Sequence, residues 1–249
     1  MVLPKGFSFG SQEKVIYYKT DSRRLTFREY WNIIGFPRVI FPWICKVLAI
    51  PLRLPEGIPG PTPFKEMLVE LPTIPEPARQ QVGEKLESLR ALGFGQSWCF
   101  LPKDSLMSGT GYGAMALHHS GQVAAKIVYA KYGTVETLVQ GFITKLADGR
   151  TILTTDNKPR LLPPSGVDVE RLAGASTMVL WKRHSKRMLA ASSVSAPIIF
   201  ANLDHIAAFE DEYSRRNCEF HIARGVWVPM SSDEVEALRR TRATTQRVT

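Results

Sequence analysis

Five segments of strand-like composition follow one another in the middle of the chain with short connections. They cover residues 97–101, 112–118, 123–132, 135–146 and 150–155. Asp148-Gly149 and, less strongly, Ser120-Gly121 are dipeptides typical of the tight turns in β-hairpins. Because these connections leave no room for the crossovers that parallel pairing needs, we expect the five strands to form an antiparallel meander.

Two helices are predicted to flank this meander. The first is expected over residues 75–92, where Val82, Leu86 and Leu89 form an apolar stripe. The second is expected over residues 167–189, with one apolar side toward the sheet. The sequence therefore predicts an α+β fold, a five-stranded antiparallel meander flanked by two helices, with an apolar N-terminal arm and a helical C-terminal extension.

Proline content and hydrophobic pattern divide the rest of the chain. Residues 1–60 are expected to form an apolar and basic arm with a proline-rich spacer, residues 61–191 the α+β core domain, and residues 192–249 the helical extension. Within the extension, one helix is expected over residues 202–217. Another is expected to begin at Ser231-Ser232-Asp233-Glu234, whose spacing fits a capping box.

The arm between residues 30 and 53 combines apolar, aromatic and basic side chains. Its uncharged runs are short, because Lys46 interrupts them and Arg38 and Arg53 bound them, whereas a membrane-spanning helix needs about twenty apolar residues. On one helix these cations would form a basic stripe on an apolar cylinder, which is typical of a helix lying in a membrane interface. Alternatively, the arm packs on its own core or in a groove of a partner chain. The expected contact residues are Trp31, Phe36, Arg38, Phe41, Trp43, Lys46, Leu48 and Arg53.

The second predicted helix carries four cations near its end. Lys182 and Lys186 are four residues apart, as are Arg183 and Arg187, so we expect one cationic ridge. Such a ridge either adds favourable charge at a helix C-terminus or contacts an anionic surface. The formal net charge of +9 agrees with anionic partners. Nucleic acid is not expected, because no recognisable reader motif accompanies the charge.

The sequence contains no motif that identifies a catalytic or metal site. His118 and His119 end a predicted strand, where consecutive side chains point to opposite faces, so the pair is not expected to bind one metal ion. Cys218 and His221 have half the spacing of a zinc site, but no second pair stands nearby. We therefore predict no catalytic residue, no metal and no cofactor.

Three hypotheses about function follow. The first is a non-enzymatic, membrane-associated interaction or structural protein, or a subunit of a membrane-linked assembly, tethered by its N-terminal arm and in contact with other protein chains. It is expected at the cytoplasmic face of a membrane, because the three cysteines lack a CxxC pair and no signal-peptide core opens the chain. The second is a small-molecule or lipid-binding module, and the third is a hydrolase or transferase without a recognisable motif. The pocket of the second hypothesis would be lined by Tyr112, Tyr129, Phe142 and Trp181.

Overall fold

The structure, a computed structural model, describes residues 15–34, 38–47, 56–102, 109–132, 134–158 and 161–246. The strands are β1 (Tyr17–Thr20), β2 (Glu56–Pro59), β3 (Leu68–Val69), β4 (Phe94–Phe100), β5 (Gly109–His118), β6 (Ala124–Tyr132), β7 (Val135–Lys145), β8 (Thr151–Thr155), β9 (Val167–Arg171) and β10 (Trp227–Pro229). The helices are α1 (Phe27–Ile34), α2 (Ile40–Val47), α3 (Ala78–Arg90), α4 (Thr177–Ser192), α5 (Leu203–Ala223) and α6 (Ser232–Gln246). Short 3-10 helices cover Ser22–Arg24, Phe64–Met67 and Leu71–Thr73.

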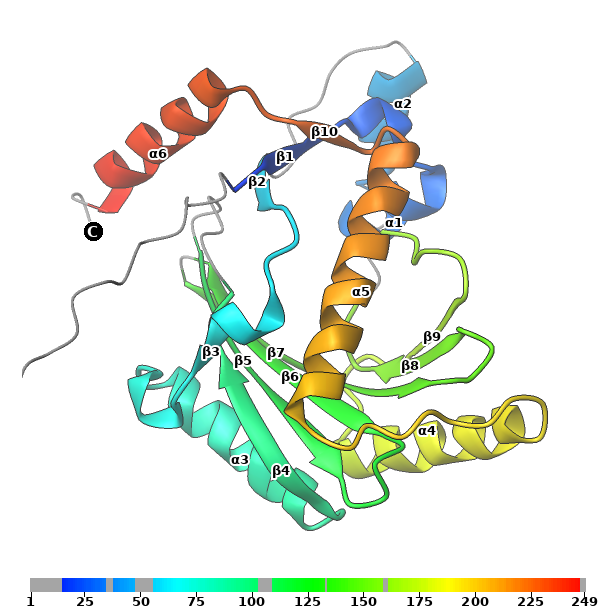
Figure 1. The fold of residues 1–249 in the computed structure, drawn as a ribbon. Coiled ribbons are helices and arrows are strands. Elements are labelled where there is room, and N and C mark those ends of the chain that lie inside the picture. The colour runs from blue at the N-terminus through cyan, green and yellow to red at the C-terminus, as the bar shows by residue number, and fades with distance from the viewer. Residues whose placement is uncertain are drawn as a thin grey trace, which may run out of the picture.

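The main sheet has seven strands in chain order from β3 to β9. Neighbours from β3 to β8 are antiparallel, and β8 and β9 are parallel. Helices α3 and α4 cover one face of this sheet, and α5 crosses the opposite face (Figure 1). The predicted α+β class is thus confirmed, with helices on both faces of the sheet.

The prediction of a five-stranded antiparallel meander is wrong. The five predicted segments correspond to β4–β8, but β3 and β9 extend the sheet at its two edges. β9 occupies the start of the second predicted helix, because Val167 and Val169 alternate with charged residues and pair in register with β8. The helix α4 begins only at Thr177, where the Ser176 side chain accepts a hydrogen bond from the backbone N–H of Val179.

The sheet separates two apolar cores because strand side chains alternate between its faces. On one side, α3 buries the predicted stripe of Val82, Leu86 and Leu89 against β5 and β6, which confirms that helix. Burying each of these side chains contributes roughly 1.5–3 kcal/mol. On the other side, α5 packs on residues such as Met115 and Ile143.

A second sheet joins the two ends of the chain. β1 lies between β2 and β10 and pairs antiparallel with both. The proline-rich segment predicted as a spacer therefore contributes the strand β2 to this second sheet. The helix predicted from residue 202 is confirmed as α5 and continues to Ala223. The capping box before α6 is also confirmed, since the Glu234 N–H donates to Ser231 Oγ (3.2 Å) and the Ser231 N–H donates to the Glu234 carboxylate (2.9 Å).

Candidate functional site

α1 and α2 are attached to the rest of the protein by a small buried cluster. The cluster consists of Leu25, Tyr30, Val39 and Val226. The Tyr30 hydroxyl donates a hydrogen bond to the Ser22 carbonyl (2.6 Å), and Trp43 packs edge-on against the Tyr30 ring. The inner side of the arm is therefore folded onto its own protein, as one of the two alternatives for this arm predicts.

A buried ion pair connects α1 to the end of α5. The Glu29 residue is 0% exposed, and its carboxylate accepts hydrogen bonds from the Arg224 guanidinium (2.8 and 2.7 Å). It also accepts hydrogen bonds from the backbone N–H groups of Thr26 (2.9 Å) and Leu162 (3.1 Å). Burial alone would raise the pKa of Glu29, but these hydrogen bonds outweigh it and lower the pKa to about 2.

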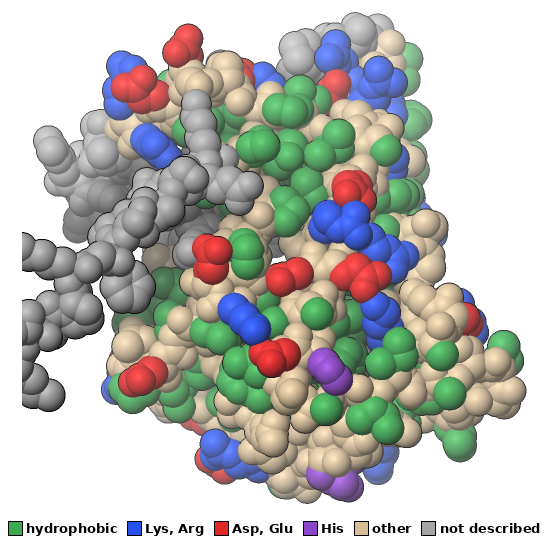
Figure 2. Space-filling view, in the orientation of Figure 1, with side chains coloured by type: hydrophobic (Ala, Val, Ile, Leu, Met, Phe, Trp, Pro, Cys, Tyr) green, Lys and Arg blue, Asp and Glu red, His purple; other side chains and the backbone are tan. Residues whose placement is uncertain are grey.

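The outer side of α1 and α2 is apolar and exposed. We define the α1–α2 apolar face as Phe27, Trp31, Ile40, Phe41, Ile44 and Val47, which are between 42% and 71% exposed. The Phe27 ring lies 6.1 Å from the ring of Trp31 and 5.1 Å from that of Trp43, so aromatic contacts link the two helices. Hydrophobic side chains follow the upper right edge of the molecule, where these helices lie (Figure 2).

Two arginines lie next to this face in the sequence, and α1 and α2 carry no exposed carboxylate. Glu29 is the only acidic residue of α1 and α2, and it is buried. Arg28 and Arg38 are exposed, and neither forms an ion pair within the described ranges. Lys46 points inward, because its ammonium donates to the Leu25 carbonyl and lies 4.8 Å from the centre of the Trp43 ring. The predicted basic stripe is therefore not formed at Lys46.

The structure describes three of the other residues that were predicted to form this contact surface. Trp31 and Phe41 belong to the apolar face, whereas Trp43 is half-buried beneath it. Three further predicted contact residues lie outside the described residues. They are Phe36, Leu48 and Arg53.

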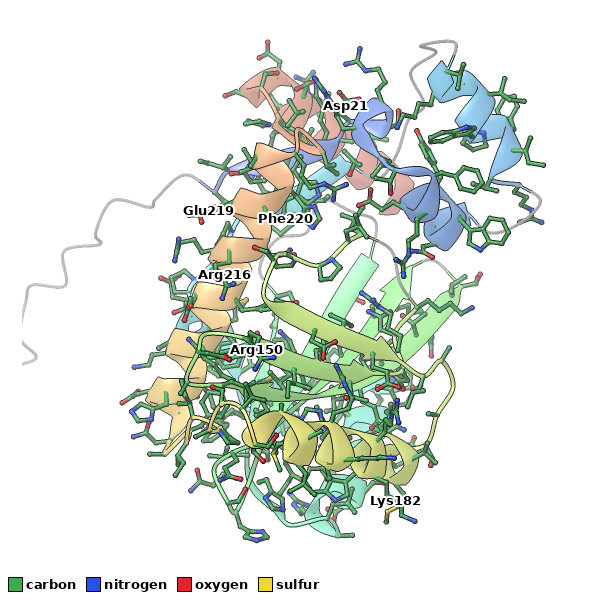
Figure 3. All side chains as sticks on the ribbon, turned by 90° about the vertical axis from the view of Figure 1, so that its right-hand side faces the viewer. Asp21, Arg150, Lys182, Arg216, Glu219 and Phe220 are labelled. Atoms are coloured by element: carbon green, nitrogen blue, oxygen red, sulfur yellow. The ribbon has the colours of Figure 1, made fainter. Side chains whose placement is uncertain are left out.

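The cationic ridge predicted on α4 is divided between solvent and the sheet. Lys182 and Lys186 are exposed, and Lys182 points away from the body of the molecule (Figure 3). Arg183 instead donates to the Glu170 carboxylate at 2.7 Å. Arg187 pairs with the Asp168 carboxylate at 2.8 Å and also reaches carbonyls of the sheet. The two arginines therefore attach α4 to β9, although Arg183 stays exposed, and the two lysines face solvent.

The aromatic residues predicted to line a pocket form part of a packed core. Tyr129 and Phe142 are fully buried between the sheet and the helices α3 and α4, with Tyr112 and Trp181 packed against them. The ring centres of Phe142 and Trp181 are 5.4 Å apart. This arrangement leaves the predicted pocket filled by its own side chains.

The side chains of His118 and His119 do not point to opposite faces of the sheet, contrary to the prediction. Their ring centres are 4.0 Å apart, because His119 has left the strand and bonds to the Gly93 carbonyl (3.2 Å). His118 packs against Trp181 and contacts the Ser120 hydroxyl (2.9 Å). Across the described part of the chain, no group of three or more histidine, cysteine or acidic side chains is placed to hold a metal ion.

A cavity of about 350 Å³ lies on the opposite face of the sheet, beside α5. Its apolar wall comes from β6, β7, β8 and α5. These apolar residues are Val128, Val139, Ile143, Leu153 and Phe209, and Leu161 adds to them from the segment after β8. Its charged residues are Lys126, Lys158, Arg171 and Glu210, with Tyr213 beside them.

The charges in this cavity are unequally paired. Lys126 forms an ion pair with Glu210, whose second carboxylate oxygen is buried without a hydrogen bond to any described residue. Arg171 is half-buried and makes no hydrogen bond or ion pair within the described ranges. Burial lowers the pKa of Arg171; the neighbouring Tyr213 opposes this effect, and the charge of Arg28 adds to it.

This cavity was not predicted from the sequence. Lys126 interrupts the apolar run of residues 123–130, which indicates a polar position inside the protein. Glu210 stands beside two further acidic residues in the sequence, and its partner Lys126 is 84 positions away in the chain, so no local pattern reveals its burial.

Comparisons with protein families, curated proteins and solved structures found no match. Among the described helices, none is long and apolar enough to cross a membrane. The chemistry of the two surfaces described above is therefore the basis for assigning a function.

Proposed function

We propose that this protein is a non-enzymatic, peripheral membrane protein that docks on an anionic lipid surface through the α1–α2 apolar face. The observation that carries the proposal is the set of six exposed apolar side chains on two adjacent short helices that present no exposed carboxylate. Aromatic rings beside arginines are typical of helices that lie in a membrane interface. The odd number of cysteines without a CxxC pair favours the cytoplasmic side.

The dimensions of the helices favour lying on the membrane over crossing it. α1 and α2 have 8 residues each. A helix of this length measures about 12 Å, whereas the hydrocarbon core is about 30 Å thick. An interfacial helix buries its apolar face to a depth of roughly 5–10 Å, which suits these dimensions.

The energy available from this face supports reversible binding. Burying a large apolar side chain fully contributes about 2 kcal/mol, and the six residues are roughly half exposed, so inserting them gains about 6 kcal/mol before the costs of docking. Arg28 and Arg38 add about 1 kcal/mol each near an anionic surface. A groove on a protein partner would use the same apolar area, but these two arginines favour anionic headgroups.

Vesicle flotation of the full chain tests this proposal. The chain is mixed with vesicles of phosphatidylcholine alone or with 30% phosphatidylserine, and its recovery in the floating fraction is measured. We expect binding to the anionic vesicles, and a loss of at least tenfold in the double variant Phe41→Ser/Ile44→Ser. The double variant Arg28→Gln/Arg38→Gln should lose the preference for phosphatidylserine.

A matched control separates docking from general hydrophobicity. Leu189 and Val194 are 73% and 78% exposed near the end of α4, far from α1 and α2 in the sequence. The double variant Leu189→Ser/Val194→Ser should float like the unmodified chain. Equal flotation of this control and the Phe41→Ser/Ile44→Ser variant, or no flotation of the unmodified chain, would contradict the proposal and favour a protein partner.

A further inference from the structure

Arg171 is the unusual residue of the cavity beside α5. It ends β9, opposite Thr155 of β8, with its side chain half-buried. No described residue forms a hydrogen bond or an ion pair with its guanidinium. The charge of Arg28 is close enough to disfavour the charge of Arg171 further. A partly desolvated guanidinium without a counter-ion is costly, and an anion placed against it would remove that cost.

The acidic residues near Arg171 are occupied elsewhere. Asp168 and Glu170 of β9 point to the other face of the sheet, where they pair with the arginines of α4. Glu210 is paired with Lys126 across the cavity. The uncompensated charge that faces the cavity is therefore positive.

The walls of the cavity specify the rest of the ligand. Val128, Val139, Ile143 and Leu153 project from alternate positions of three neighbouring strands, and Phe209 adds an aromatic ring from α5. These groups bind hydrocarbon and offer no hydrogen bonds. A volume of about 350 Å³ lies at the lower end of the range of known ligand pockets, so the ligand is small.

We propose that this cavity binds a small amphipathic carboxylate, such as a medium-chain fatty acid. The carboxylate forms paired hydrogen bonds with the Arg171 guanidinium, whose planar geometry matches two carboxylate oxygens. The hydrocarbon chain lies along the strand side chains toward Phe209. Lys158 also lines the cavity but is exposed to solvent, so Arg171 is the half-buried cation that has no partner among the described residues. One half-buried guanidinium suits one negative charge better than the two charges of a phosphate monoester. The cavity lies close to α1, because its wall residue Leu161 packs on the cluster that attaches α1 and α2. None of its lining residues belongs to the α1–α2 apolar face, so the two proposals are tested by different variants.

Isothermal titration calorimetry of the full chain with octanoate tests the proposal. We expect saturable binding at one site, and at least tenfold weaker binding of 1-octanol, octylammonium and octyl phosphate. The variant Arg171→Gln should bind octanoate at least tenfold more weakly, which corresponds to 1.4 kcal/mol. As a matched control, Arg183→Gln removes the same charge from the opposite face and should change the affinity less than twofold.

A second variant tests the cavity itself and does not depend on the charge. Val139→Phe places a ring in the space next to the strand wall and should abolish octanoate binding while thermal unfolding shows a folded protein. The proposal is wrong if the unmodified chain shows no saturable binding. It is also wrong if folded Arg171→Gln keeps its affinity, or if octyl phosphate or octanol binds as tightly as octanoate.

Discussion

Replacing Glu29 by glutamine should detach α1 and α2 from the body of the protein. Glu29 is fully buried and its carboxylate receives two hydrogen bonds from Arg224, at the C-terminal end of α5. Glutamine keeps the size of the side chain but removes the charge. The Arg224 guanidinium then remains partly buried without a counter-charge, which is costly.

The loss of stability expected for Glu29→Gln follows from the pKa of Glu29. The pKa falls from 4.5 to about 2 in the folded protein, and each unit corresponds to about 1.4 kcal/mol, so ionised Glu29 contributes about 3 kcal/mol. Because the folded pKa is depressed, this contribution is fully present above about pH 4.5. It is lost as the pH falls toward 2, when Glu29 of the folded protein takes up a proton.

Hydrogen exchange of the backbone amides of α1 and α2 measures this effect directly. At pH 7, Glu29→Gln should lower their opening free energy by about 3 kcal/mol. The difference from the unmodified protein should shrink as the pH approaches 3. Glu219→Gln is the control, because Glu219 forms an exposed ion pair with Arg215 on the same helix α5 and its loss should cost less than about 1 kcal/mol. A pH-independent difference, or one no larger than that of the control, would refute the reasoning.

Two further predictions concern the packing of the main sheet. Burial lowers the pKa of His184 to about 3, so the neutral ring should contribute its full stability above about pH 6.5. The free energy of unfolding in urea should therefore fall between pH 6.5 and pH 3, and the variant His184→Gln should lack this loss. Gly113→Ala should destabilise the protein by about 1–3 kcal/mol, because a Cβ atom there would lie 2.3 Å from the Phe100 ring. Gly95→Ala is the control, because a Cβ atom at that position would have no atom within 4 Å. Equal melting temperatures for the two alanine variants would contradict this packing.

The central strands of the sheet could be predicted because their signals are local. Alternating apolar residues and tight turns such as Asp148-Gly149 act over a few residues, and β4–β8 follow from them. The edge strands could not be predicted in the same way. β3 has only 2 residues, and the apolar positions Val167 and Val169 fit both a short strand and the first turns of a helix.

The surfaces were harder to predict than the elements that carry them. Trp31 and Phe41 were expected to make contacts, and the structure places both on one exposed face. Lys46 and Arg187 were expected at the surface as well, but the carbonyl groups of Leu25 and Leu153 bind them. Such pairings join segments that are distant in the chain, so neither spacing nor periodicity reveals them.

The depth of Val47 in a bilayer tests membrane docking most directly. A nitroxide attached at Val47→Cys, on the most exposed side chain of the α1–α2 apolar face, reports its surroundings by electron paramagnetic resonance. With vesicles containing phosphatidylserine, the label at position 47 should become accessible to oxygen and protected from a water-soluble nickel complex, while a label at Val194→Cys stays accessible to nickel. If both labels remain equally accessible to nickel on adding vesicles, the α1–α2 apolar face does not enter the membrane.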